Sequence, residues 1–113
     1  MGNRIHENSS MKSLEEIRQQ LQTGKFEFTR HAFKRAIERN ISEQFIREAG
    51  ANALIIEDYP ADKYSPSCLL LGFTQDKCPL HIQVSRMESD KIRIITLYEP
   101  DEQEWINYRV RRK

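Results

Sequence analysis

Hydrophobic residues in the first half of the chain recur every three or four positions, the spacing of an amphipathic helix. A hydroxyl residue stands directly before each of the three runs, and the first, Ser13, forms a capping box with Glu16. Gly24 and Asn40 follow the first two runs, where a left-handed residue ends a helix. The pattern predicts helices over residues 14–22, 30–39 and 43–50, with Ser13, Thr29 and Ser42 as their N-caps.

After Gly50 the hydrophobic period becomes two, which is typical of strands with one buried face. The connections 75–79 and 88–90 are short and polar, so we expect antiparallel hairpins. Trp105 and Tyr108, three positions apart behind an acidic first turn, predict a short terminal helix over residues 101–108. The strands are predicted over residues 53–59, 68–74, 80–87 and 91–98.

These elements predict an α+β fold in which three N-terminal helices pack on a four-stranded antiparallel sheet. The chain has 113 residues, 38% of them hydrophobic and 31% charged, which favours one folded domain with a solvated surface over disorder. We expect a flexible segment over residues 1–12, the domain over residues 13–108 and a basic tail over residues 109–113.

No hydrophobic run approaches the roughly 20 residues that a membrane helix needs, and residues 1–10 lack the apolar stretch of a secretory signal. We therefore expect a cytoplasmic protein without a membrane partner. Cys68 and Cys78 match no metal or disulfide motif and are expected to be reduced thiols.

Positive charge is concentrated on the second predicted helix, although the net charge is only +1. His31, Arg35 and Arg39 are four residues apart and therefore share one face of that helix. Arginine presents planar donors that match phosphate oxygens, so this face is a candidate phosphate-binding stripe. A plainly solvated basic face is the commoner alternative. The candidate phosphate-binding residues are Arg30, Lys34, Arg35 and Arg39.

His81 is the second candidate for chemistry. Leu80, Ile82 and Val84 alternate onto one face of the third predicted strand, which sends His81 to the other face. If the helices cover the Leu80 face, His81 opens onto water near Tyr98. The alternative is an ordinary solvated polar face. Tyr98 and Trp105 could stack a nucleobase, although aromatic residues more often fill a core.

Several motifs of nucleotide and metal chemistry are absent from the sequence. It contains no glycine-rich phosphate loop, no nucleophile elbow, no His-Glu-x-x-His and no cluster of carboxylates. We therefore expect any catalysis to need no cofactor and no metal.

Residues 28–42 resemble the signature of a bacterial family known only as domain of unknown function 4258. The chain departs from that pattern at Asn40, where glycine is common, a change compatible with a left-handed cap. The resemblance extends from about residue 26 to residue 105. The later segments that are similar in kind and order are Asp58-Tyr59-Pro60, Pro66-Ser67, Leu71-Gly72, Pro79-Leu80-His81-Ile82 and Ile95-Thr96-Leu97-Tyr98-Glu99-Pro100, followed by Trp105.

The family in turn resembles the compact RelE- and BrnT-type toxins, which cleave RNA without a metal and are paired with an antitoxin. The resemblance implies a similar fold, RNA as a substrate and a cognate antitoxin protein as a partner. Fold-level analogy alone does not fix function. By position, it places His31, Arg35, Arg39, His81 and Tyr98 in the site.

The leading hypothesis is therefore a metal-independent endoribonuclease of a toxin-antitoxin system. His31 or His81 would take the proton of a ribose 2′-hydroxyl, and Tyr98 or the other histidine would assist the leaving group. Arg35 and Arg39 would hold the phosphate. One alternative is a non-catalytic module that binds RNA or a protein, and another is a structural motif whose arginines are tied to carboxylates. The joint mechanism requires His31 and His81 in one cleft.

Overall fold

The helices begin at the three hydroxyl residues that the sequence indicated, in the computed structural model, which describes residues 11–113. The side chains of Ser13, Thr29 and Ser42 each accept a hydrogen bond from the backbone N–H three residues later, which satisfies one free donor of the first turn. The prediction of three helices is confirmed. They are α2 (Leu14–Gln22), α3 (Arg30–Glu38) and α4 (Glu43–Ala51).

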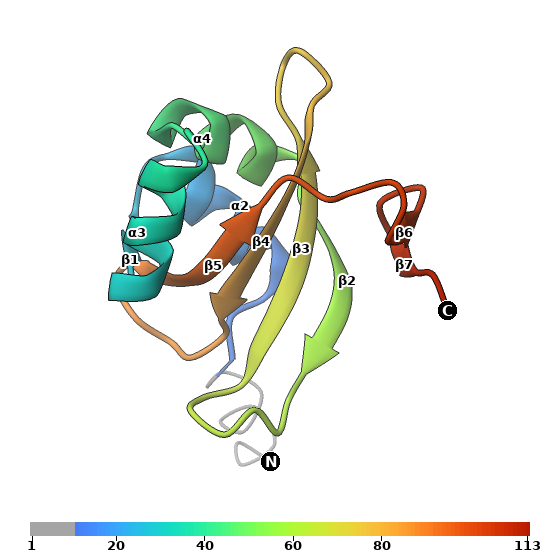
Figure 1. Ribbon diagram of the computed structural model, residues 1–113. Coiled ribbons are helices and arrows are strands. Elements are labelled where there is room, and N and C mark those ends of the chain that lie inside the picture. Colours follow the sequence, from blue (N-terminus) through green and yellow to red (C-terminus); the bar gives the residue numbers. More distant parts are fainter. Residues whose placement is uncertain (1–10) are drawn as a thin grey trace.

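The sheet has five strands in the order β1-β5-β4-β3-β2, and its first pair, β1 with β5, is parallel. The prediction of a four-stranded antiparallel sheet is therefore wrong, although the antiparallel run from β2 to β5 is present (Figure 1). The additional strand has only three residues, too few to show a period of two. The strands are β1 (Phe26–Phe28), β2 (Leu54–Tyr59), β3 (Ser67–Phe73), β4 (Pro79–Ser85) and β5 (Ile92–Tyr98).

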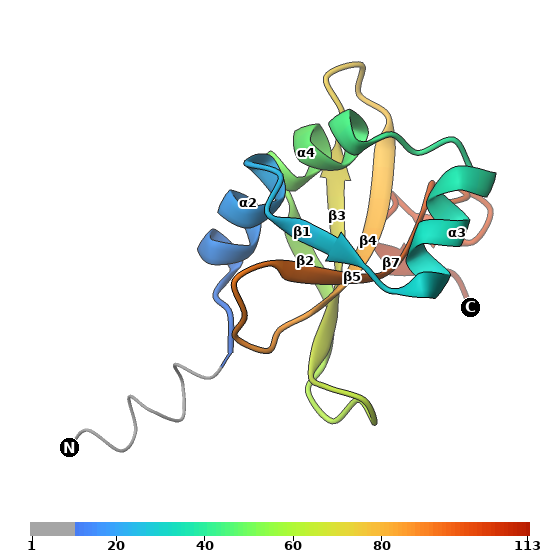
Figure 2. The same cartoon turned by 90° about the vertical axis from the view of Figure 1, so that its left-hand side faces the viewer.

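The helices cover one face of the sheet and enclose the main core (Figures 1 and 2). Alternate residues of the central strands face them, such as Leu70 of β3 and Ile82 of β4, both almost fully buried. Gly72 lets β3 approach α4 closely, since a Cβ atom there would lie 2.0 Å from the carbonyl oxygen of Ala49. We call the opposite face of the sheet, which carries His81, the open face.

A small C-terminal hairpin replaces the terminal helix that was predicted over residues 101–108. It consists of β6 (Trp105–Ile106) and β7 (Val110–Arg111). The turn between them has positive φ at Asn107 (53°) and Tyr108 (62°), and the N–H of Arg109 donates to the carbonyl of Ile106 at 3.0 Å. These are the features of a type I′ turn, which joins strands and excludes a helix.

The two ends of the described chain both contact the sheet. Met11 pairs with Met87, and the buried ammonium of Lys12 donates to the carbonyl of Ser89 at 2.7 Å. Residues 1–10 of the expected flexible segment lie outside the described residues. Strand β7 falls within the expected tail. Among residues 11–113 no helix is both long enough and apolar enough to cross a membrane.

Candidate functional site

Helix α3 is fixed to the edge of the sheet at both of its ends. Its N-cap, Thr29, bonds β5 through its backbone N–H, which donates to Ile94 at 3.0 Å, and through its hydroxyl. Near its other end, Arg39 donates a guanidinium N–H to the carbonyl of Leu97 at 2.8 Å. Ala32 and Ala36 are buried between these anchors. The outer face of α3 is therefore a rigid platform.

The predicted stripe lies along this platform. His31 and Arg39 are exposed, and Arg35 is partly exposed, with its guanidinium 2.6 Å from the carboxylate of Glu38. An ion pair of this kind on a helix surface contributes only about 0.3–0.5 kcal/mol, so Arg35 can exchange it for a phosphate at little cost. The alternative of arginines tied to carboxylates holds only for Arg35, because Arg39 bonds a backbone carbonyl, and neither guanidinium is buried.

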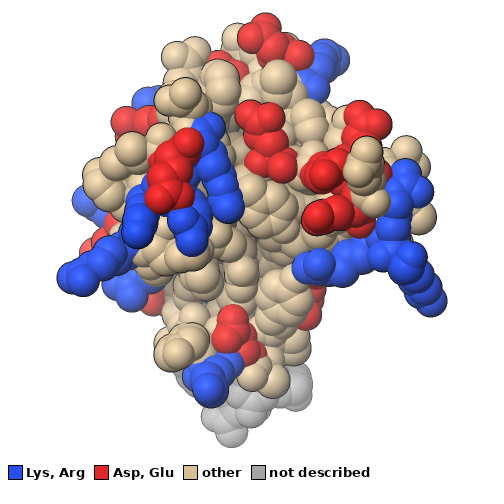
Figure 3. All heavy atoms as spheres, in the orientation of Figure 1, with Lys and Arg blue, Asp and Glu red and all other residues tan. Residues whose placement is uncertain are grey.

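Arg30 and Lys34 form the neighbouring row of α3, between the stripe and the row of Phe33 and Ile37. Both side chains are exposed, and neither forms an ion pair with another residue in the range 11–113. Figure 3 shows lysine and arginine side chains gathered over α3 and, across a largely uncharged surface, over the C-terminal hairpin. Acidic side chains lie beside both groups.

His81 faces the open side of the sheet, as the alternation predicted, but it does not reach water. Its side chain has no exposed surface, because the C-terminal hairpin covers it. The indole of Trp105 stands edge-to-face against the imidazole, with ring centroids 4.5 Å apart. Tyr98 flanks the ring at 5.2 Å. The expectation of an open position is wrong because it considered only the helices as a cover of the sheet, whereas the C-terminal hairpin covers the other face.

Both nitrogens of the His81 ring have partners. Nε2 lies 2.7 Å from the backbone carbonyl of Tyr108, which can only accept, so Nε2 carries the proton. Nδ1 lies 3.2 Å from the hydroxyl of Tyr98 and in a neutral ring accepts its proton. Burial lowers the pKa of His81 and raises the pKa of Tyr98. At neutral pH the imidazole of His81 is thus uncharged, and its Nδ1 accepts a hydrogen bond from the protonated phenol of Tyr98.

The hairpin is held over His81 by a second set of contacts. The guanidinium of Arg111 lies 4.6 Å from the centre of the Trp105 ring and donates to Glu57 of β2 at 2.9 and 3.2 Å. The hydroxyl of Tyr59 also bonds Glu57. Burial raises the pKa of Glu57, but the hydrogen bonds from Arg111 and Tyr59 outweigh it, so the pKa lies below its usual value.

The structure brings only some of the predicted residues together. Tyr98 touches His81, and Arg39 bonds the residue that precedes Tyr98 on β5. His31 is exposed on α3 and forms no hydrogen bond within residues 11–113, whereas His81 is sealed under the hairpin. Acid or base roles for both histidines stay predictions. The sequence reasoning missed Tyr108, Arg111 and Glu57.

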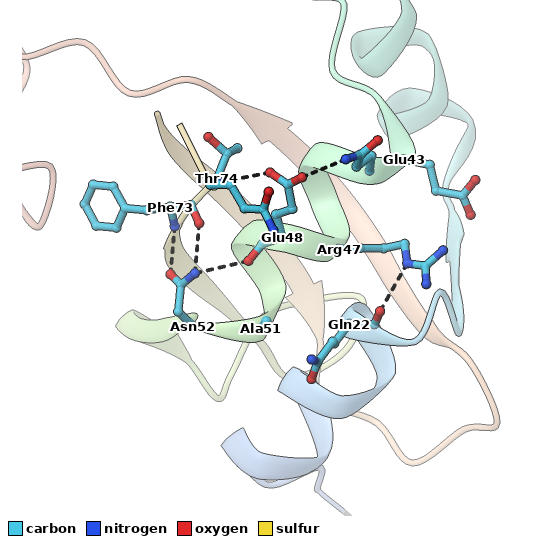
Figure 4. Close-up of a pocket in the computed structure, with 10 residues that line it drawn as sticks. Gln22, Glu43, Arg47, Glu48, Ala51, Asn52, Phe73 and Thr74 are labelled. Atoms are coloured by element: carbon cyan, nitrogen blue, oxygen red, sulfur yellow. Dashed lines mark hydrogen bonds between the residues drawn. The ribbon is translucent and has the colours of Figure 1, made fainter. Parts of the chain in front are cut away.

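A cavity of about 700 Å³ beside the end of α4 contains none of these residues (Figure 4). Its polar groups bind one another. The amide of Asn52 pairs with the backbone N–H and carbonyl of Phe73, both at 2.8 Å, and Glu48 accepts from Gln75 and Gln44. Over the described part of the chain, no three His, Cys, Asp or Glu side chains are grouped to hold a metal.

The burial of His81 predicts a pH dependence of stability. The folded pKa lies below the unfolded value of 6.5, so the unfolded chain binds a proton that the folded chain does not. The contribution of His81 to the free energy of unfolding should therefore have its full value above pH 6.5 and should decrease as the pH is lowered towards the folded pKa. Urea unfolding across this range measures the fall.

Nitrogen NMR of the His81 ring shows whether this pH dependence of stability comes from His81. In the folded protein at neutral pH we expect a neutral ring with the proton on Nε2, because burial lowers the pKa of His81. An imidazolium there, or a proton on Nδ1, would contradict the arrangement with Tyr98 and Tyr108. His31→Ala is the control, because an exposed ring without partners should leave the pH dependence of unfolding in place.

Comparison with known protein families matches residues 28–99, more than half of the chain, to the family described as "Domain of unknown function (DUF4258)". The matched range contains α3 with its stripe and the strands that carry His81 and Tyr98, but not the C-terminal hairpin. No curated protein and no solved structure matches the chain. The likeness to RelE- and BrnT-type toxins therefore stays a hypothesis.

Proposed function

The chain belongs to the DUF4258 family of domains of unknown function, and we propose that it is a metal-independent endoribonuclease of the toxin type that binds RNA through α3. The observation that supports this proposal is the stripe of His31, Arg35 and Arg39 on a helix fixed to the sheet at both ends. Such a stripe presents one imidazole that can accept a proton and two guanidinium groups that can donate hydrogen bonds to phosphate oxygens, in a fixed order. A cognate antitoxin protein is the proposed partner.

In the proposed reaction, His31 takes the proton of a ribose 2′-hydroxyl, and the 2′ oxygen attacks the neighbouring phosphorus. Arg35 and Arg39 bind the phosphate oxygens and stabilise the charge of the pentavalent transition state. The bond to the 5′ oxygen breaks, leaving a 2′,3′-cyclic phosphate. Tyr98 gives its proton to the departing 5′ oxygen and regains one from solvent.

His81 has a positioning role in this proposal. Before the reaction its Nδ1 accepts a hydrogen bond from the Tyr98 hydroxyl, and the carbonyl of Tyr108 fixes the ring, so the phenol oxygen is held in place. The O–H then turns from Nδ1 to the departing 5′ oxygen. Burial raises the pKa of Tyr98, which keeps the hydroxyl protonated before the reaction. A buried ring with two bonded nitrogens supports this role better than a direct exchange of protons with RNA.

The test is incubation of the purified protein with single-stranded RNA in excess EDTA. We expect cleavage, with products that end in a 2′,3′-cyclic phosphate. Loss of the general base in His31→Ala should slow it by about 10²–10⁴-fold. Arg47→Gln is the matched control, because Arg47 is an exposed helix arginine outside the stripe that donates to a backbone carbonyl. Intact RNA with the wild-type protein, or equal cleavage by His31→Ala, would contradict the proposal.

A non-catalytic RNA-binding module is the second candidate, and the burial of His81 favours it. With this ring sealed, the site offers RNA one accessible histidine instead of the two that the joint mechanism requires. The same experiment separates the two functions. A binding module would retain RNA in a salt-dependent way and leave it uncut.

A further inference from the structure

A shallow groove runs along the outer edge of the sheet, between strand β1 and helix α3. Its volume is about 510 Å³. Figure 2 faces this side of the molecule, with β1 in front, α3 to its right and α4 above. We call this the edge groove. It is lined by Phe26, Phe28, Phe33, Ala36, Ile37, Asn40, Ile41, Ser42 and Glu43.

The wall of the edge groove on α3 is hydrophobic and exposed. Phe33 and Ile37 are four residues apart, and 56% and 62% of their surfaces are accessible. The ring of Phe33 stands edge-to-face on Phe28, with centroids 6.0 Å apart, so the exposed row continues into the edge strand. A helix normally turns such residues inward, whereas the inward row of α3 is Ala32 and Ala36.

The floor of the edge groove has unused backbone groups. In a parallel pair, alternate residues of a strand bond the neighbouring strand. The N–H of Ile92 donates to Lys25 and the N–H of Thr29 donates to Ile94, so the odd-numbered residues of β1 bond β5. The N–H and carbonyl groups of Phe26 and Phe28 therefore point outward. No loop backbone within residues 11–113 bonds them.

Positive charge flanks the exposed hydrophobic row, and the acidic residue one turn after Lys34, Glu38, pairs with Arg35. Arg30 lies three residues before Phe33, and Lys34 lies three residues before Ile37, so each cation neighbours one exposed hydrophobic side chain. Neither forms an ion pair within the described part of the chain. Glu43 supplies negative charge only at the opposite end, beside Asn40 and Ser42.

From these features we infer that the edge groove binds an extended, acidic segment of a partner protein, which adds a strand to β1. The segment bonds the outward groups of Phe26 and Phe28. Its hydrophobic side chains on the face towards α3 cover Phe33 and Ile37, and carboxylates two positions away, on that same face, reach Arg30 and Lys34. The edge groove adjoins the proposed RNA stripe of His31, Arg35 and Arg39, and Arg30 and Lys34 lie between the two surfaces. The inference does not rest on ribonuclease activity.

A second copy of the chain fits the edge groove less well. The antiparallel arrangement with the longest overlap pairs Phe26 with Phe28 of the other copy and sets the two Glu27 side chains directly opposite each other. Like charges in that position destabilise a strand pair, although the ion pair of each Glu27 with Arg93 weakens this effect. The unpaired cations of the two rims would also approach each other. Charge complementarity therefore selects an acidic segment.

Selection from a phage library of random dodecapeptides on the immobilised wild-type protein tests the inference. We expect the enriched peptides to carry two hydrophobic residues two positions apart, with Asp or Glu two positions before or after them, and to lack proline at the bonding positions. In solution, Phe33→Asp should weaken binding of the best peptide roughly tenfold or more. Val110→Asp is the matched control, because Val110 is 60% exposed on the C-terminal hairpin, and it should bind normally.

Charge reversal gives a second readout. The double variant Arg30→Glu with Lys34→Glu should reject the acidic peptides and select basic ones with the same hydrophobic spacing. Three outcomes would overturn the inference. They are peptides that bind Phe33→Asp as well as wild type, enrichment without acidic residues, and a wild-type dimer in light scattering that Phe33→Asp dissociates.

Discussion

Replacing His81 by alanine is expected to lower the free energy of unfolding by about 3–5 kcal/mol. The substitution removes a fully buried ring that packs against Trp105 and leaves a cavity in its place. It also deprives the Tyr98 hydroxyl and the Tyr108 carbonyl of their partner. Urea unfolding, followed by tryptophan fluorescence, measures the change.

The control for this prediction is His31→Ala. Because His31 is exposed and makes no hydrogen bond within residues 11–113, its loss should change the free energy of unfolding by less than about 0.5 kcal/mol. If His81→Ala were as stable as wild type but inactive on RNA, the positioning role would be wrong. A direct catalytic role of His81 would then be the better account.

Gly72→Ala is expected to cost about 3 kcal/mol in free energy of unfolding. A Cβ atom at this position would lie 2.0 Å from the carbonyl oxygen of Ala49 and 2.6 Å from its carbonyl carbon. Both atoms belong to the backbone, so α4 must move away from β3 to make room. Thermal or urea unfolding of the variant gives the size of the loss.

Gly24→Ala provides the comparison for Gly72→Ala. Gly24 has φ of +80°, but a Cβ atom there would meet nothing closer than 3.9 Å. Only the backbone conformation is strained, at a cost of about 1–2 kcal/mol. A loss at Gly72 smaller than the loss at Gly24 would show that the packing of α4 on β3 is looser than described.

The helices were predictable because their signals are local. A hydroxyl N-cap acts on an amide three residues away, and a hydrophobic row repeats within a few turns. Ser13, Thr29 and Ser42 therefore place the helices to within a residue or two. The strands β2 to β5 were found for a similar reason, since each is a hydrophobic run or alternation of six or seven residues, such as the continuous run of β3.

The fifth strand could not be found in the same way. Strand β1 has three residues, and its partner β5 lies 66 residues later in the chain, at the register Phe26 to Ile92. Its formation depends on that distant partner and on α3, which packs beside both strands (Figure 2). The alternation in Phe26-Glu27-Phe28 is the only local trace of it.

The C-terminal hairpin was missed for a different reason, and this omission changed the site. Trp105 and Tyr108 have the spacing of a helix, yet Asn107 and Tyr108 take left-handed conformations and reverse the chain. Asn107 was the available signal, since asparagine favours that conformation. The face of His81 was correctly predicted, but its burial depends on this hairpin.

The salt dependence of RNA binding tests the central claim most directly, with or without cleavage. The measurement is the affinity of a single-stranded RNA across a range of salt concentrations for wild type, Arg39→Gln and the control Arg47→Gln. If α3 holds phosphates, Arg39→Gln should bind more weakly, with a logarithmic salt slope reduced by about 0.7, while Arg47→Gln matches wild type. Equal affinities and slopes for all three proteins would contradict an RNA-binding stripe, and both proposed functions would fail with it.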